Sequence, residues 1–112
     1  MEYKIYYFKT VKFTIDPYYN KKISMDKKYM DDNYFHIYTG TLDEPSEDTH
    51  QNLQRIMSLF NSDNNPLSNS EYQMNIRSNM LHTSMSVNDV VFINGEFYRV
   101  DNFGFNKIKI KN

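Results

Sequence analysis

Three histidines, His36, His50 and His82, are the side chains best suited to bind a metal ion or to transfer a proton near neutral pH. No two of them have the spacing of a metal-binding motif, and the sequence contains no cysteine to complete a site. The sequence also lacks nucleophile-elbow, zinc-protease and phosphate-binding glycine motifs. We therefore expect no metal, no cofactor and no enzymatic activity.

The charged residues are unevenly distributed, although the net charge is only −1. Residues 1–28 hold seven lysines and three acidic residues, whereas residues 29–64 hold seven acidic residues and one basic residue, Arg55. This distribution either serves solubility or forms an acidic patch that docks on a basic groove where nucleic acid would bind. The candidate partner-binding residues are Asp31, Asp32, Asp43, Glu44, Glu47 and Asp48.

A second candidate surface lies near the C-terminal end of the sequence. Lys107, Lys109 and Lys111 alternate along a predicted strand, so they share one face. They either protect a sheet edge from aggregation or, together with Arg99, contact a nucleic-acid backbone.

The chain is rich in aromatic residues, with ten Tyr and eight Phe. Exposed rings on a sheet face can stack on the bases of single-stranded nucleic acid, and Tyr34, Tyr38 and Tyr98 are candidates for this role. For most of the aromatic residues we instead expect burial in the core.

The length of 112 residues predicts a single domain over residues 1–112. Residues 3–13 are predicted to form a strand that ends before Asp16 and Pro17, and residues 18–32 form a loop or one short helix. A second strand is predicted over residues 34–42. Its expected faces are Tyr34, His36 and Tyr38 on one side and Phe35, Ile37 and Thr39 on the other.

One helix is predicted from an N-cap at Asp48, with Gln51 three residues later, to about residue 60. Its apolar stripe must face a core and consists of Leu53, Ile56, Met57 and Phe60. The polar residues 61–66 end the helix. Residues 71–82 fit either a strand or a helical turn, and their pattern does not decide between the two.

The last third of the sequence predicts a β-hairpin in which Asn94 and Gly95 form a type I′ turn between residues 90–93 and 96–100. This turn places Ile93 opposite Glu96, Phe92 opposite Phe97 and Val91 opposite Tyr98. Gly104 marks another reversal before a final strand over residues 105–110. The predicted fold is α+β, a curled antiparallel sheet or small barrel of about five strands packed by one main helix.

Residues 82–91, His-Thr-Ser-Met-Ser-Val-Asn-Asp-Val-Val, are the most distinctive segment. Their hydroxyl groups are expected to fix a turn that enters a buried strand. Together with Tyr98-Arg-Val-Asp-Asn-Phe-Gly-Phe105, this segment resembles the YodL-like domain family, small proteins of conjugative elements and phage-like islands of Firmicutes. The resemblance implies an origin in a mobile element and a related fold, and it supplies no active site.

From these observations we expect a non-enzymatic binding protein of a mobile element or phage. Its partner would be a host protein of a nucleic-acid-targeting defence, inhibited through the acidic surface in the manner of anti-CRISPR or anti-restriction proteins. The alternative is a small nucleic-acid-binding regulator that uses the C-terminal lysines. The N-terminus has no signal-like apolar segment and no run is long enough to span a membrane, so we expect a cytoplasmic protein without a membrane partner.

Overall fold

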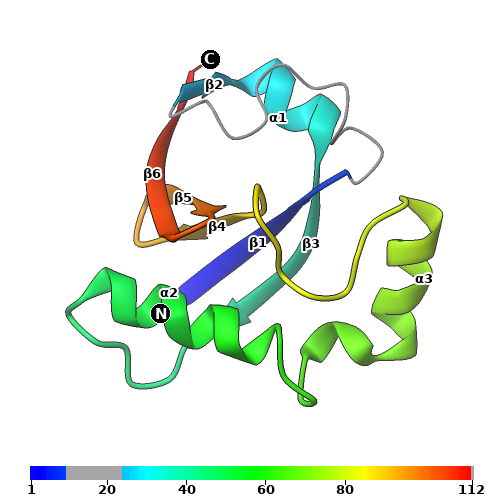
Figure 1. Cartoon of the computed structure of the whole chain (residues 1–112), viewed down its shortest axis with the longest axis horizontal. Helices are drawn as coiled ribbons and strands as arrows, with labels where there is room; N and C mark the ends of the chain where they lie inside the picture. The colour runs from blue at the N-terminus through cyan, green and yellow to red at the C-terminus, as the bar shows by residue number, and fades with distance from the viewer. Residues whose placement is uncertain (10–23, 112) are drawn as a thin grey trace.

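The computed structural model describes residues 1–9 and 24–111. Its centre is a curled sheet of six strands in the order β2-β6-β5-β4-β1-β3 (Figure 1). The strands are β1 (Glu2–Phe8), β2 (Ser24–Asp26), β3 (Tyr34–Thr41), β4 (Val90–Ile93), β5 (Glu96–Asp101) and β6 (Gly104–Lys111). The described helices are α1 (Lys27–Asn33), α2 (Thr49–Leu59), the 3-10 helix η2 (Pro66–Ser68) and α3 (Ser70–Ser78). The predicted α+β class and curled sheet are confirmed, with six strands rather than about five.

The predicted C-terminal hairpin is confirmed residue by residue. Strands β4 and β5 pair with Ile93 opposite Glu96 and Phe92 opposite Phe97. The turn residues Asn94 and Gly95 have φ values of 53° and 78°, as a type I′ turn requires. The next reversal places Asp101 opposite Gly104, from which β6 continues antiparallel to β5.

Strand β3 departs from the predicted strict alternation because the pairing of β1 with β3 contains a bulge. Ile5 lies opposite Tyr38, whereas the next residue, Tyr6, lies opposite His36, which leaves Ile37 as the extra residue. Ile37 is buried, and Tyr38 packs against the same core cluster as Ile37. The predicted separation of Tyr38 from Ile37 on opposite faces is therefore wrong, since one inserted residue reverses the faces beyond it.

The main core lies between the sheet and the helices α2 and α3. The predicted stripe of α2 is confirmed, because Leu53, Ile56 and Phe60 are buried and Met57 packs against them at the edge. Asp48 is the N-cap, and its side chain accepts a hydrogen bond from the backbone N–H of His50. Gln51 does not complete a reciprocal capping box, because Ser46 Oγ accepts the Asp48 N–H instead.

The opposite face of the sheet carries a second core cluster, covered by α1. Its buried residues are Phe8, Met25, Met30, Tyr34, Val90 and Ile108. Strand β2, which leads into α1, pairs in parallel with β6, so the expectation of a purely antiparallel sheet is wrong at this edge. The first strand is predicted to continue to residue 13 and to end before Asp16 and Pro17. This predicted end lies outside the described residues.

Two segments that the sequence pattern left open are helical. Residues 27–33, within the segment predicted as a loop or short helix, form α1 with an N-cap at Asp26. Residues 70–78 form α3, which buries Ile76 against the main core. Asn69 caps α3 by accepting the backbone N–H of Glu71, a local signal that favours the helix over the strand.

Tyr3 provides a test of the main core at alkaline pH. Burial, together with the neighbouring Tyr38, raises the pKa of Tyr3 from 10.0 to about 12. Between these values the unfolded chain releases the phenol proton while the folded chain retains it, so the free energy of unfolding should fall as pH rises from 10 to 12. We expect Tyr3→Phe to reduce this decline, measured by urea unfolding at several pH values. An unchanged decline in the variant would mean that Tyr3 titrates as an exposed tyrosine.

Candidate functional site

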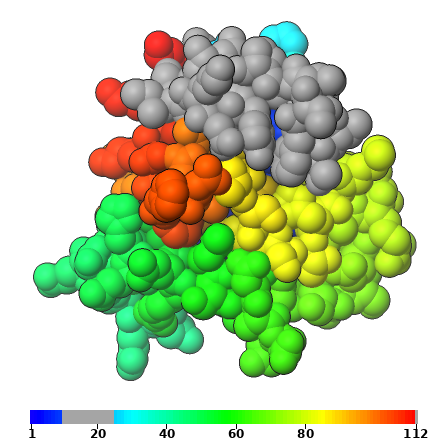
Figure 2. All heavy atoms as spheres, in the orientation of Figure 1, coloured from blue at the N-terminus to red at the C-terminus, as the bar shows by residue number. Residues whose placement is uncertain are grey.

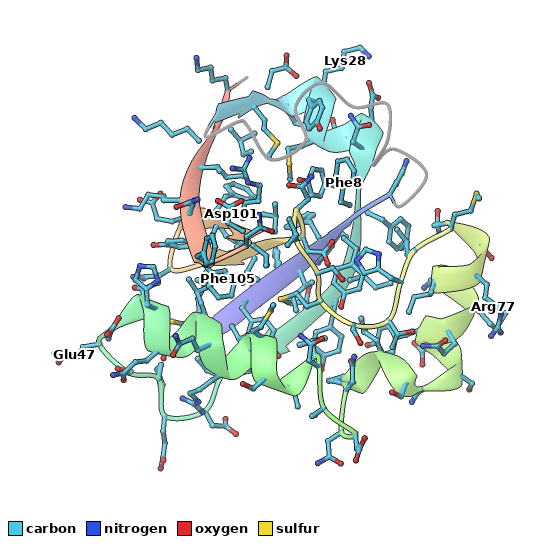
Figure 3. The ribbon with its side chains drawn as sticks, in the orientation of Figure 1. Phe8, Lys28, Glu47, Arg77, Asp101 and Phe105 are labelled. Atoms are coloured by element: carbon cyan, nitrogen blue, oxygen red, sulfur yellow. The ribbon has the colours of Figure 1, made fainter. Side chains whose placement is uncertain are left out.

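The six acidic candidate residues do not form one patch. Asp31 and Asp32 lie on α1, which precedes β3, whereas Asp43, Glu44, Glu47 and Asp48 lie between β3 and α2. The two groups are therefore separated by the full length of the eight-residue strand β3. Figure 3 shows this separation, with Lys28 of α1 and Glu47 at opposite ends of the molecule.

The acidic residues of α1 are paired with lysines of the same helix. Lys27 Nζ lies 3.0 Å from Asp31 Oδ2, and Lys28 Nζ lies 2.6 Å from Asp32 Oδ2. The hydrogen bond and the charge of Asp32 raise the pKa of Lys28. Such exposed pairs contribute little to stability, but they cancel the local negative charge. Asp31 and Asp32 are thus poor candidates for an acidic binding surface.

The loop between β3 and α2 is held by its backbone rather than by its carboxylates. Arg55 Nη1 donates to the carbonyl oxygen of Glu44 at 3.0 Å, and Nη2 donates to that of Asp43 at 2.8 Å. The side chain of Asn52 accepts the N–H of Ser46 and donates to its carbonyl oxygen, both at 2.8 Å. The loop is thereby attached to the first turns of α2 at several points.

This arrangement leaves three carboxylates available, those of Asp43, Glu44 and Glu47, which we call the acidic loop. All three are exposed, and within residues 1–9 and 24–111 none of them forms an ion pair. The nearby basic residue, Arg55, binds loop carbonyls instead. Asp48 differs, because its carboxylate caps α2. The acidic loop is therefore a group of exposed carboxylates on a fixed backbone, with no ion-pair partner in the part of the chain that the structure describes.

The second candidate surface is divided as well. Lys107, Lys109 and Lys111 are exposed on one face of β6, as the alternation predicts. Arg99 is only 3% exposed, and its Nε atom lies 3.5 Å from Asp101 Oδ1. Because Tyr98 pairs with Lys107 whereas Arg99 pairs with Asn106, Arg99 lies on the opposite face of the sheet. The predicted grouping of Arg99 with the lysines in one surface is therefore wrong.

The candidate stacking aromatics are also placed differently. Tyr34 and Tyr98 are buried, and Tyr38 packs against the main core. Half-buried or exposed rings instead form a row on the face that carries Arg99. In this row His36 stacks on Tyr6 at 5.0 Å, Tyr6 lies 6.1 Å from Phe97, and Phe97 lies 4.6 Å from Phe92. The available rings and the lysines of β6 thus occupy opposite faces.

Sequence reasoning missed a buried polar centre at Asp89. The Asp89 carboxyl group is fully buried and accepts the backbone N–H of Phe8 at 2.9 Å and that of Ser86 at 2.7 Å. His82 Nε2 lies 2.7 Å from Asp89 Oδ2, and the His82 ring stacks on Tyr7 at 4.4 Å. Burial raises the pKa of Asp89, and the hydrogen bonds from His82, Phe8 and Ser86 oppose this shift.

This centre fastens the distinctive segment 82–91 to β1. Tyr7 Oη donates to the carbonyl oxygen of Thr83 at 2.8 Å, and Val100 N–H donates to the carbonyl oxygen of Asp89. The Asp89 carboxyl group accepts more of the segment's side-chain hydrogen bonds than the hydroxyl groups, which were expected to fix this turn, form. The only signal in the sequence was a histidine seven residues before an aspartate, which is not specific to any fold.

Two further features limit the kinds of site that the described residues contain. In residues 1–9 and 24–111, no three His, Asp or Glu side chains converge where a metal ion could bind. Among the helices of the same residues, none has the length and apolar character needed to cross a membrane.

Comparison with known proteins gives one informative result. No protein-family model matches the chain, and no solved structure matches it significantly. The chain is 38% identical over 99 residues to a protein of Acanthamoeba polyphaga mimivirus named "Uncharacterized protein R785". This similarity covers 81% of the chain and 87% of the viral protein. The chain therefore belongs to the same family as this mimivirus protein.

Proposed function

We propose that the protein is a non-enzymatic binding protein of a virus or mobile element that inhibits a nucleic-acid-targeting defence of its host. The acidic loop binds a basic, nucleic-acid-binding groove of the defence protein and competes with phosphate for that groove. The observation that carries this proposal is the group of three exposed carboxylates on a loop whose backbone is fixed by Arg55 and Asn52.

Two arguments support the proposal. A preorganised loop loses little conformational entropy on binding, so its charges contribute more of their attraction to affinity. A family with a member in a virus is also consistent with a role against host defences. The resemblance to the YodL-like family stays a prediction, as does the assignment to the anti-CRISPR or anti-restriction type.

The proposal is tested with Asp43→Asn/Glu44→Gln/Glu47→Gln, which neutralises the acidic loop. We expect this variant to retain at least tenfold less nucleic-acid-binding protein from a host-cell lysate than the unchanged chain, because interface charges guide and hold a basic partner. Duplex DNA added as a competitor should release the retained proteins. Capture followed by mass spectrometry and a DNA titration measures both effects.

A matched control removes the same number of charges elsewhere. Asp31→Asn/Asp32→Asn/Glu71→Gln changes two paired residues of α1 and one exposed residue of α3. This control should retain the partner, and both variants should unfold within about 0.5 kcal/mol of the unchanged chain. Equal retention by the two variants, or retained proteins that DNA does not release, would contradict the proposal.

The second candidate function is a nucleic-acid-binding regulator, favoured by the exposed lysines on one face of β6. It is weakened by the placement of Arg99 and of the half-exposed rings on the other face, since one strand of nucleic acid cannot contact both faces at once. Steeply salt-dependent binding to DNA or RNA, lost on replacing Lys107, Lys109 and Lys111 by Gln, would favour this function over the first.

A further inference from the structure

The tip of the β5–β6 hairpin presents an aromatic side chain to solvent. Phe103 follows Asp101 and Asn102 at the reversal and is fully exposed. The hairpin on either side of the tip is well held, because Asp101 is bonded to Asn106 and lies beside Arg99. Exposure of a large apolar ring to water is unfavourable in free energy, and a partner that covers the ring removes this unfavourable contribution.

A hollow of about 430 Å³ lies between this tip and α2. Its walls are Phe103 and the neighbouring hairpin residues on one side and His50, Gln54 and Met57 of α2 on the other. In Figure 3, Asp101 and Phe105 of the hairpin lie above the first half of α2, and Figure 2 shows the hairpin standing out from the surface over this helix. The hollow thus has an aromatic rim beside a mixed polar and apolar floor.

One residue of the acidic loop, Glu47, lies close to this hollow along the chain. Glu47 is three residues before His50, which lines the hollow in the first turn of α2. Glu47 also lines a separate depression together with Asn94 of the β4–β5 turn. Of the acidic loop, Glu47 therefore lies nearest in sequence to the hollow, whereas Asp43 and Glu44 lie beside Arg55, which does not line it.

We propose that Phe103 is the apolar anchor of the partner-binding surface and that the partner is a protein segment combining basic and apolar side chains. This inference rests on the proposed function and adds a requirement to it, since a partner with charge alone would leave Phe103 exposed. Charge complementarity selects the occupant: the acidic loop attracts lysine or arginine, and an apolar side chain of the same segment enters the hollow against Phe103.

Two other exposed apolar residues of the described chain provide a contrast. Met74 and Met80 are 64% and 62% exposed, but they belong to α3 and its C-terminal end, away from the acidic loop (Figure 1). Met80 lies beyond the C-terminal end of α3 and lines neither the hollow beside Phe103 nor the depression beside Glu47. Met80 is therefore a matched control for an exposed apolar residue outside the proposed surface.

The test uses two synthetic helical peptides of equal length and equal positive charge. One carries leucines at i, i+3 and i+4 spacing among its arginines, and the other has serine in place of every leucine. We expect the leucine peptide to bind the unchanged chain about tenfold more tightly, and Phe103→Ser to remove that advantage while leaving the serine peptide unaffected. NMR titration of the labelled chain measures the affinities and shows which amides respond.

Each outcome has a definite meaning. Equal affinity of Phe103→Ser and the unchanged chain for the leucine peptide would overturn the inference, as would an equal loss in Met80→Ser. The Phe103 side chain is fully exposed, so its replacement removes no buried contact and should leave the unfolding transition unchanged. A shift of that transition would also count against the inference.

The inference and the proposed function can fail separately. If neutralising the acidic loop has no effect on either peptide but Phe103→Ser still weakens the leucine peptide, the electrostatic proposal is wrong and the anchor stands. If the acidic-loop variant loses both peptides and Phe103→Ser loses neither, the electrostatic proposal stands and the anchor is wrong.

Discussion

Asp89→Ala should lower the free energy of unfolding by about 3 kcal/mol, among the largest effects of any single substitution in the described chain. The alanine leaves the backbone N–H groups of Phe8 and Ser86 without an acceptor, and the Phe8 group is buried. It also removes the partner that orients His82. Urea unfolding followed by circular dichroism measures the loss.

Asp89→Asn removes the charge and one of the two backbone hydrogen bonds, and it keeps the other. The remaining amide oxygen can still accept the Phe8 N–H, but the amide N–H₂ group cannot accept the N–H of Ser86, so we expect an intermediate loss of about 1 to 2 kcal/mol. Asp63→Ala, at an exposed position between α2 and η2, should leave stability unchanged. If Asp89→Ala is as stable as Asp63→Ala, the buried centre does not hold segment 82–91 in place.

Phe60→Ala should lower the free energy of unfolding by about 3 to 5 kcal/mol, because it leaves a cavity in a fully buried part of the main core. The Phe60 ring has no exposed surface and packs edge-on against Tyr3 and Tyr38, with ring centroids 6.4 and 5.3 Å away. The tyrosines should then become mobile, which near-ultraviolet circular dichroism detects alongside the loss of stability.

Met57→Ala is the control for this effect, since Met57 belongs to the same stripe of α2 but is only partly buried. It should cost about 1 kcal/mol. Equal losses in the two variants would mean that α2 packs on the sheet along its edge rather than through Phe60. The backbone of Phe60 adds to its importance, because its carbonyl oxygen accepts the side-chain amide of Asn65 at 2.7 Å.

The parts of the fold that the sequence predicts correctly depend on neighbouring residues. Asn94 and Gly95 determine the hairpin turn by their own backbone preferences, and the register of β4 and β5 follows from that turn. Asp48 and the stripe ending at Phe60 determine α2 in the same way. In both cases a few adjacent side chains contain all the information that the element needs.

The parts that the sequence does not predict depend on distant residues. Three-residue β2 is a strand only because β6 pairs with it, and the bulge at Ile37 arises where β3 must match β1. A charged residue such as Arg99 is expected to be exposed on a strand. Only its pairing with Asn106 of β6 shows that it lies on the face opposite the lysines. None of these relations is visible in a single stretch of sequence.

The candidate site shows the same division. The sequence correctly marks Asp43, Glu44 and Glu47 as acidic and close to a helix start, but it cannot show that Arg55 binds the loop backbone, so that no described residue pairs with these carboxylates. It groups Asp31 and Asp32 with them, although eight residues of extended chain lie between the groups. The centre at Asp89 is missed because its Phe8 donor is 81 residues away in the chain.

The position of β1 in the sheet has a consequence for how the chain acquires its structure. This first strand lies between β3 and β4 and pairs with residues 90–93. Strand β2 forms only when it pairs with β6, more than 80 residues later in the sequence. A ribosome must therefore release the chain as far as residue 111 before the sheet can close. Such high contact order slows folding, so the newly made chain should depend on chaperones more than a helical bundle of equal size.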